Sequence, residues 1–395
     1  MREGMKKRKG NEPLTSDNFS ATPGEIYKYL FAKRCSNKER IRIVQWNIER
    51  AYKLDGIIRL LKQVNADIIL VQEIDVFCER SNNRNSAEEI CKELKMDGVF
   101  VVEFLEIKSS RRTIKTQGGG WHGNGILSRY PIENARSIIH NFKAVNWNKD
   151  GWKYKEPRVG ERLVITAEIN IGYYIQVYSI HLEVFCGIFG RLRQFVDVMR
   201  DVHRVLKQGK IQHFAVFGDL NTMAHGVARL LKSYCRDEMR WRSLGNSEAQ
   251  WWQKHLFDVT NRENSKLKKF CPRHLSEEEI KELWNPYFYD AHSTIMTLQQ
   301  YKGLLYKGKL DWTLLRAFKL LDSGTENNQF YLSDHRLLWV DVEASFDTDA
   351  AKICYLRHYR IKKEEICRKR QYPILVILAL VLLFILAGIL FVPKQ

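Results

Sequence analysis

Residues 41–74 of the chain read IRIVQWNIERAYKLDGIIRLLKQVNADIILVQEI, and this stretch decides the class of fold. Its two ends, residues 41–49 and 66–74, are apolar runs of the length expected for β-strands. Residues 54–64 between them repeat apolar side chains at helical spacing, which places on one face Ile57, Ile58, Leu61 and Val64. A strand, a helix and a second strand within about thirty residues predict an α/β fold.

The same alternation of patterns continues along the chain. Further strands are predicted at residues 123–130, 162–171, 173–183, 213–221, 309–315 and 335–343, and a long amphipathic helix is predicted at 190–207. The segment Glu25–Lys33 is a candidate helix. We therefore predict a basic N-terminal segment at 1–38 and one layered α/β domain at 39–346. This domain contains a less regular, aromatic-rich insertion at 232–308.

The composition excludes several classes of protein. Of the 395 residues 45% are hydrophobic, which is too many for a disordered or fibrous chain. The eight cysteines include no Cys-x-x-Cys pair, which argues against a disulfide scaffold or a structural zinc site and favours a reducing compartment. The formal net charge of +18 predicts an anionic partner, either nucleic acid or an acidic membrane surface.

The positive charge is concentrated near the two ends of the sequence, where residues 1–9 and 352–370 hold ten of the eighteen excess charges. The second basic run precedes residues 374–392, which contain no charged side chain and at about 1.5 Å per residue match a ~30 Å hydrocarbon core. We predict a single-pass C-terminal transmembrane helix at 374–392, after a basic juxtamembrane segment at 347–373 that binds anionic lipid. Because basic flanks stay on the cytoplasmic side, the domain is expected in the cytosol.

Polar side chains stand at the ends of the predicted strands, where packing does not require them. These residues are Asn47, Glu73, His181, Asp219, Asn221, Asp311, Asp334 and His335. Each has a structural explanation when taken singly, such as a turn, an ion pair or a strand cap. Because strand ends hold side chains rigidly while loops leave them accessible, the whole set predicts an active site.

The residue types in this set indicate phosphate-ester chemistry. The set contains four carboxylates and two asparagines but no cysteine, which suits a hard cation that prefers oxygen ligands, namely Mg²⁺ or Mn²⁺. Hydrolysis of a phosphate ester needs such a metal, a positioned water and donors for the developing negative charge. The sequence contains no His-Glu-x-x-His zinc motif, no Gly-x-Ser-x-Gly elbow and no P-loop, which excludes three other common hydrolase designs.

Seven short motifs follow one another in a fixed order: WNIE (46–49), VQE (71–73), GNGILSRYPI (123–132), SIHLE (179–183), GDLN (218–221), LDW (310–312) and SDH (333–335). In this order they resemble the motifs of the endonuclease/exonuclease/phosphatase superfamily, the DNase I-like hydrolases, over about residues 39–345. The resemblance implies a four-layered α/β sandwich with two central mixed β-sheets flanked by helices. The predicted transmembrane helix would be an addition to that fold.

The resemblance also implies roles for the residues that hold metal and phosphate. Glu73 resembles the main Mg²⁺ ligand of the family, Asn47 a residue beside metal and phosphate, and Asp334 a further metal contact. Asn221 resembles a phosphate-contacting donor. His181 resembles the histidine that binds the scissile phosphate and stabilises the transition state.

Three further residues are implied in the handling of the attacking water. Asp219 resembles the carboxylate that orients or activates this water. Asp311 and His335 resemble the Asp–His pair of the family, with His335 as general base or electrostatic donor. Arg129 and Arg162 lie in strands typical of the family, and we expect them to form structural ion pairs rather than to contact phosphate.

The substrate is less sharply indicated than the reaction. The predicted membrane span and its basic flank favour a membrane phosphodiester, such as a phospholipid or sphingolipid headgroup. The alternatives are a membrane-tethered nuclease that acts on DNA or RNA, and an inactive scaffold of the same fold. The presence of every catalytic-type residue argues against the scaffold.

Overall fold

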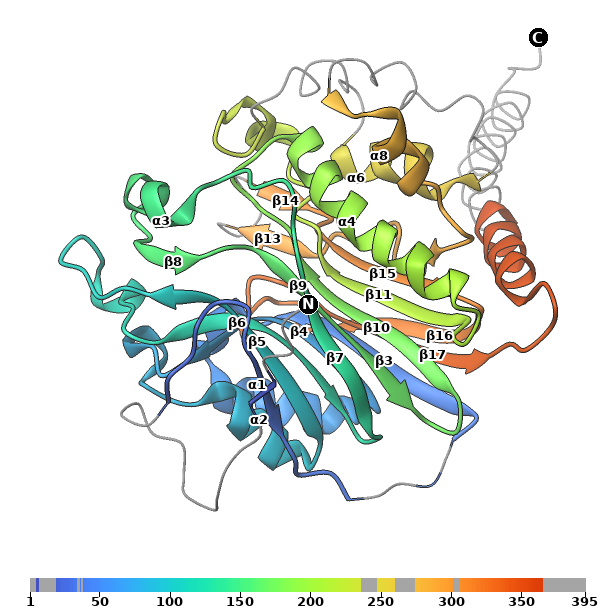
Figure 1. The fold of residues 1–395 in the computed structure, drawn as a ribbon, viewed down its shortest axis with the longest axis horizontal. Helices are drawn as coiled ribbons and strands as arrows, with labels where there is room; N and C mark the ends of the chain where they lie inside the picture. The colour runs from blue at the N-terminus through green and yellow to red at the C-terminus, as the bar shows by residue number, and fades with distance from the viewer. Residues whose placement is uncertain are drawn as a thin grey trace, which may run out of the picture.

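The computed structural model describes residues 5–6, 19–33, 36, 38–235, 247–259, 274–300 and 306–364. Two β-sheets lie face to face at its centre, and helices cover their outer faces (Figure 1). The predicted mixed α/β fold, with two central mixed sheets flanked by helices, is therefore confirmed.

The first sheet contains the strands that open the sequence pattern. In spatial order they are β1 (Met5–Lys6), β2 (Ile26–Tyr29), β5 (Asp97–Glu106), β6 (Trp121–Ser128), β4 (Ile68–Val76), β3 (Arg40–Asn47), β17 (Leu337–Ala344) and β16 (Phe318–Glu326), with β8 (Arg158–Gly160) paired to β5. β3 and β4 are parallel, as the strand–helix–strand pattern requires, and β6 is antiparallel to both β4 and β5.

The second sheet is built mainly from the middle of the chain. Its strands, in spatial order, are β12 (Tyr289–Asp290), β15 (Asp311–Arg316), β11 (His213–Asp219), β10 (Tyr174–His181), β9 (Leu163–Asn170) and β7 (Ile132–Ile139). The predicted strands on either side of Gly172 are β9 and β10, which pair antiparallel, whereas β10 and β11 are parallel. A separate ribbon pairs β13 (Leu298–Gln300) with β14 (Tyr306–Gly308).

Helices bury the apolar outer faces of both sheets. α1 (Leu54–Val64) and α2 (Ser86–Leu94) cover the first sheet, and α4 (Ile188–Lys207), α6 (Glu248–Trp252) and α8 (Glu277–Glu282) cover the second. The short elements are α3 (Trp147–Asp150), η1 (Glu49–Ala51), η2 (Glu79–Ser81), η3 (Ile114–Thr116), η4 (Gly151–Tyr154), η5 (Gly226–Leu230) and η6 (Gln253–Phe257). A third apolar cluster fills the space between the sheets, so the described residues form four packed layers.

The expected helix at Glu25–Lys33 is wrong. Residues 26–29 form the strand β2, which pairs antiparallel with β5. Ile26, Tyr27 and Tyr29 are β-branched or aromatic side chains, and all three are buried. The pairing partner lies about seventy residues away in the sequence, and no local pattern in residues 25–33 predicts it.

Described parts of the aromatic-rich insertion pack into the main core. Trp252, Phe257 and Phe288 belong to the apolar cluster that α4 forms with the second sheet. The Ser276–Glu279 capping box begins α8. This insertion therefore contributes to the helical layer over the second sheet.

The predicted transmembrane helix at 374–392 lies outside the described residues. Within the part of the chain that the structure describes, no helix has both the length and the apolar character needed to cross a bilayer.

Candidate active site

Strand pairing places the predicted polar residues beside one another at one end of the two sheets. In the second sheet His181 pairs with Asp219 across β10 and β11, and Asp219 pairs with Asp311 across β11 and β15. These three residues therefore form one row on three neighbouring strands. In the first sheet, Asn47 at the end of β3 pairs with Gln72 of β4, which places it beside Glu73.

One glycine allows the backbones of β10 and β11 to approach closely at this row. Gly218, immediately before Asp219, has φ +154°, and a Cβ atom there would lie 2.0 Å from the carbonyl oxygen of Ile180. Only glycine allows β10 and β11 to pair this tightly at the point where His181 and Asp219 face the site.

Glu73 is aimed by a β-bulge. Val71 and Ile74 of β4 pair with Gly125 and Gly123 of β6, so that two residues of β4 lie opposite the single residue Asn124. Glu73 has φ +59°, a left-handed conformation that is unfavourable for a non-glycine residue and that concentrates at functional sites. The bulge turns the Glu73 side chain out of the strand alternation and leaves it 21% exposed.

Asn47 connects the two sheets at the centre of the site. Its Nδ2 donates to Oε1 of Glu73 at 3.3 Å and to Oδ2 of Asp219 at 3.1 Å. The imidazole Nε2 of His181 lies 3.9 Å from Glu73 Oε1 and 3.8 Å from Asp219 Oδ2. Four predicted residues from both sheets thus meet within a few ångströms of one another.

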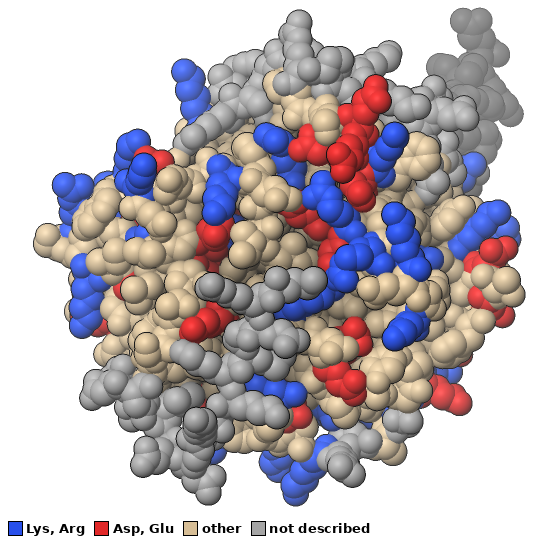
Figure 2. Space-filling view, in the orientation of Figure 1, with Lys and Arg blue, Asp and Glu red and all other residues tan. Residues whose placement is uncertain are grey.

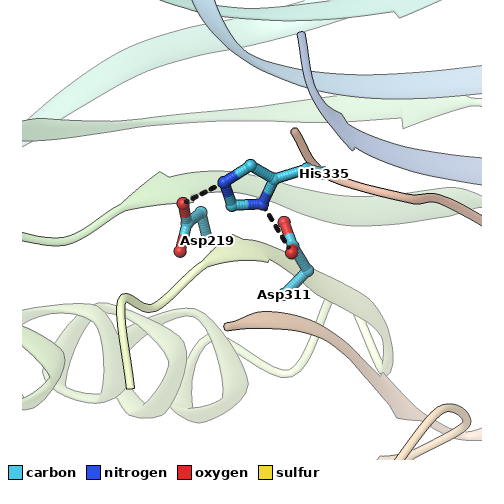
Figure 3. A group of neighbouring side chains, drawn as sticks. All are labelled: Asp219, Asp311 and His335. Atoms are coloured by element: carbon cyan, nitrogen blue, oxygen red, sulfur yellow. Dashed lines mark hydrogen bonds and ion pairs between the residues drawn. The ribbon is translucent and has the colours of Figure 1, made fainter. Parts of the chain in front are cut away.

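His335 lies between two aspartates, as Figure 3 shows. Its Nδ1 is 2.8 Å from Oδ2 of Asp311, and its Nε2 is 3.7 Å from Oδ2 of Asp219. Burial acts to lower the pKa of His335, but the carboxylates of Asp311 and Asp219 raise it well above its usual range. Burial raises the pKa of Asp219 to about 7, although the adjacent His335 acts against this shift.

Further hydrogen bonds fix the orientation of this pair. Oδ1 of Asp311 accepts a hydrogen bond from Gln45 Nε2 at 2.8 Å, and the backbone N–H of Asp311 donates to Thr297 Oγ1 at 3.0 Å. The backbone N–H of His335 donates to Ser333 Oγ, whose hydroxyl donates to the carbonyl of Asn47. These hydrogen bonds restrict both Asp311 and His335, so the imidazole Nε2 of His335 faces the site in one orientation.

Arg162 determines the tautomer of His181. Its Nη1 donates to Oε2 of Glu103 at 2.9 Å and lies 2.9 Å from Nδ1 of His181. A guanidinium has no acceptor, so Nδ1 must accept and the proton of a neutral His181 resides on Nε2, toward the site. Burial and the charge of Arg162 lower the pKa of His181 well below its usual range, which keeps the ring neutral. Arg162 thus forms the expected ion pair, with Glu103, and also positions His181.

Replacing Arg162 with methionine is expected to lower kcat about tenfold, because His181 loses the contact that holds its Nε2–H toward the site. The ¹⁵N chemical shifts of the His181 ring should change from a single Nε2–H tautomer to a mixture. Arg129→Met is the matched control, since the Arg129 guanidinium donates to Asn65 on the exposed surface. An unchanged tautomer in Arg162→Met would disprove this role.

Asn221 lies beside the row, and its side-chain amide group already donates one hydrogen bond. Its backbone N–H donates to Asp219 Oδ1 at 2.8 Å, and its Nδ2 donates to the carbonyl of Leu182 at 2.9 Å. With φ +49°, Asn221 adopts a left-handed turn that asparagine tolerates. These bonds tie the loop after β11 to the end of β10, next to His181.

Two residues at the site had no role assigned from the sequence. Glu49, in the WNIE motif, accepts the backbone N–H of Asp334 at 3.1 Å, and burial with the nearby carboxylates of Asp334 and Glu73 raises its pKa to about 7. Asn124, opposite the Glu73 bulge, is fully buried, and within the described part of the chain neither side-chain polar atom has a hydrogen-bond partner. In the sequence, both residues could have been found from their motifs, because Glu49 lies in WNIE (46–49) and Asn124 lies in GNGILSRYPI (123–132).

The site contains carboxylates on both of its sides. Burial raises the pKa of Glu49 to about 7, and the nearby carboxylates of Asp334 and Glu73 add to this shift. Mg²⁺ and Mn²⁺ bind such oxygen ligands and neutralise their charge. Asp219, Asp311 and His335 also bring ligand atoms within 4.8 Å of one another. The Asp311–His335 contact of 2.8 Å lies within this group.

Comparison with known proteins identifies the family of the chain. The model of the Endonuclease/Exonuclease/phosphatase family matches residues 44–335, more than half of the chain. No curated protein matches the sequence.

Several solved structures are similar in fold. Truncated TDP2 of Caenorhabditis elegans is 15% identical, with 77% of this chain and 98% of that chain covered at a TM-score of 0.45. A family protein from Bacteroides vulgatus is 15% identical, with 78% and 100% covered at a TM-score of 0.44. The catalytic domain of human Nocturnin with bound sulfate is 15% identical, with 79% of this chain and 97% of that chain covered at a TM-score of 0.42.

The family match runs from Val44, within β3, to His335 and so includes all of the predicted site residues. The chain therefore belongs to the endonuclease/exonuclease/phosphatase family of hydrolases, which act on phosphate-ester bonds.

Proposed function

We propose that the protein is a Mg²⁺- or Mn²⁺-dependent phosphodiesterase that is tethered to a membrane and hydrolyses a phospholipid or sphingolipid headgroup from the cytosolic side. The observation that carries the reaction type is the convergence of both imidazoles on one carboxylate. His181 Nε2 and His335 Nε2 lie 3.8 and 3.7 Å from Asp219 Oδ2, beside the carboxylate group of Glu73. This arrangement supports attack of water on a phosphodiester.

Each residue of the row has a distinct part in this proposal. Asp219 accepts a proton from the attacking water, because its carboxylate has a raised pKa and lies at the centre of the row beside Asn47. His181 and His335 donate Nε2–H to the phosphoryl oxygens as negative charge develops there. The water oxygen forms a bond to phosphorus and the bond to the leaving alcohol breaks. That alcohol takes up a proton from solvent, and Asp219 returns to solvent the proton that it accepted.

The metal would be held by Glu73, Glu49 and Asp334, with Asn47 beside it. When bound, it supplies a Lewis acid that neutralises the phosphoryl oxygens. Arg50 is the nearest cation, with its Nε 4.0 Å from Glu73 Oε2, and Nη2 of the same arginine is bound to Glu156 at 2.5 Å. The charge of Arg50 thereby reduces the repulsion between Glu73 and the neighbouring carboxylates, while the Glu73 oxygens stay available as metal ligands.

A lipid substrate is favoured by the apolar stretch at 374–392 and by its basic flank, which would hold the domain close to a bilayer. Figure 2 shows Lys and Arg side chains lying beside Asp and Glu side chains on the face in view.

A nuclease is the second candidate, and one observation favours it. The Phe185 ring stacks between two tyrosine rings. Its centroid lies 4.4 Å from that of Tyr154 and 5.7 Å from that of Tyr234, and the ring planes are within 21° of parallel. Phe185 follows His181 by four residues, so the half-buried stack lies near the row. Nucleobases stack on such surfaces.

The full chain should be assayed with sphingomyelin, a phosphoinositide and single-stranded nucleic acid, each with Mg²⁺, with Mn²⁺ and with EDTA. We expect metal-dependent hydrolysis of a lipid, with kcat/KM at least about tenfold higher than for nucleic acid. Preferential cleavage of nucleic acid would establish the nuclease instead. Absence of both hydrolysis and metal binding would support the scaffold.

A further inference from the structure

The last described helix, residues 350–364, is packed firmly on the catalytic domain (drawn red in Figure 1). Ala351, Cys354 and Tyr355 are buried against the second sheet and the insertion. The Tyr355 hydroxyl donates to the carbonyl of Phe257 at 3.2 Å, and the His358 ring stacks on Tyr289 at 4.4 Å. This helix therefore moves with the domain rather than as a loose linker.

The opposite face of the helix combines exposed apolar side chains with positive charge. Ile353, Leu356 and Ile361 are 48%, 42% and 49% exposed, so three large aliphatic side chains lie in solvent within nine residues of one helix. The same surface carries exposed basic residues at Lys352, Arg357, Arg360 and Lys363. Glu364 is the only acidic residue between positions 350 and 364.

A groove runs beside this face, between the helix and β16. It has a volume of about 420 Å³, which is within the range of small-ligand sites. Its polar lining includes Lys319, Ser323, Thr325, Arg357, His358 and Lys362. Asp322 is the one carboxylate in the lining, so the groove is net positive and suits a phosphate group.

We propose that this helix face and groove form a docking surface for an anionic bilayer, in which the aliphatic side chains enter the interface and the groove takes a lipid phosphate headgroup. The proposal rests on the membrane tethering put forward above. Glu364 is ten residues before Ile374, so the apolar stretch begins at most about 36 Å from the helix end. A surface of basic and aliphatic residues at that distance matches the composition of interfacial helices.

Docking through this surface would fix how the domain faces the membrane. The helix packs on Tyr289 of β12, and β12 pairs with β15, which begins with Asp311 of the active-site row. A bilayer that holds the helix therefore also sets the direction in which the active-site row opens.

The full chain should be reconstituted in vesicles of phosphatidylcholine alone and in vesicles that also contain phosphatidylserine, and amide hydrogen exchange of residues 350–364 should be followed by mass spectrometry. We expect exchange about tenfold slower in the anionic vesicles, with the difference removed by high salt. Equal exchange in both vesicles, or failure of the chain to float with either, would overturn the proposal.

Charge reversal at Arg357→Glu, Arg360→Glu and Lys363→Glu should abolish the difference between the two vesicles. The matched control is Lys92→Glu, Lys95→Glu and Lys115→Glu, which changes the net charge equally on exposed residues of α2, its C-terminal end and η3. If the control triple also loses the difference, general charge and not this surface is responsible.

Inorganic phosphate added to the neutral vesicles distinguishes a lipid headgroup from a soluble anion. Protection of residues 350–364 by phosphate alone would show a soluble-anion site and contradict docking to the bilayer. Both triple variants should hydrolyse a soluble phosphodiester at the wild-type rate, because neither set of residues contacts the active-site row. Loss of docking can therefore be told apart from failure of the proposed hydrolase.

Discussion

Replacement of His335 by alanine is expected to lower kcat at least about 10²-fold, because the reaction loses a donor whose position is fixed by Asp311 at 2.8 Å. The change also removes the positive partner of two buried carboxylates, Asp311 and Asp219. Steady-state hydrolysis of a soluble phosphodiester at saturating Mg²⁺ measures the loss, with the unfolding temperature determined in parallel.

His213→Ala is the matched control for this variant. His213 is a buried histidine at the start of β11, six residues before Asp219 and therefore about 20 Å away along the strand. Its Nε2 contacts the carbonyl of Ser345 at 3.0 Å, so its loss should reduce stability and leave kcat near the wild-type value. Wild-type turnover in His335→Ala would refute the assignment.

Replacement of Glu73 by glutamine is expected to abolish the response to divalent cations. The amide keeps the size of the side chain but removes the negative charge that the bulge at φ +59° aims into the site. Wild-type protein should show a rise in unfolding temperature with added Mg²⁺, because the cation binds only the folded state. In Glu73→Gln the rise should disappear and kcat/KM at limiting Mg²⁺ should fall at least about 10²-fold.

Glu133→Gln provides the comparison for Glu73→Gln. Glu133 pairs with Glu168 at the other end of the second sheet, where its carboxylate accepts from Asn170 and Tyr174. That variant should retain both the Mg²⁺-dependent stabilisation and the activity. A normal Mg²⁺ response in Glu73→Gln would show that the metal is bound by other residues.

Much of the sheet framework was predictable because the signal is local. β3, α1 and β4 appear where the 2-residue and 3.6-residue periodicities place them, and the hairpin of β9 and β10 forms around Gly172. The strand β2 was missed because its partner is β5, far along the chain, and residues 25–33 contain no alternating pattern strong enough to indicate pairing.

The sequence shows the polar residues of the candidate active site but not how they are arranged. The polar ends of β3, β10 and β11 break an apolar pattern, and that break is visible in one sequence. The register that pairs His181 with Asp219 and Asp219 with Asp311 depends on how three strands align, which no single segment encodes.

The sequence by itself determined the fold class and the eight polar residues that gather at the strand ends, because periodicity and residue type act over a few neighbouring positions. Only the tertiary structure decided that Arg162 sets the tautomer of His181 and that Glu49 joins the carboxylates around Glu73. Hydrogen-bond direction and pKa depend on distances of a few ångströms between segments that lie far apart in the chain. Those distances exist only once both sheets have packed face to face.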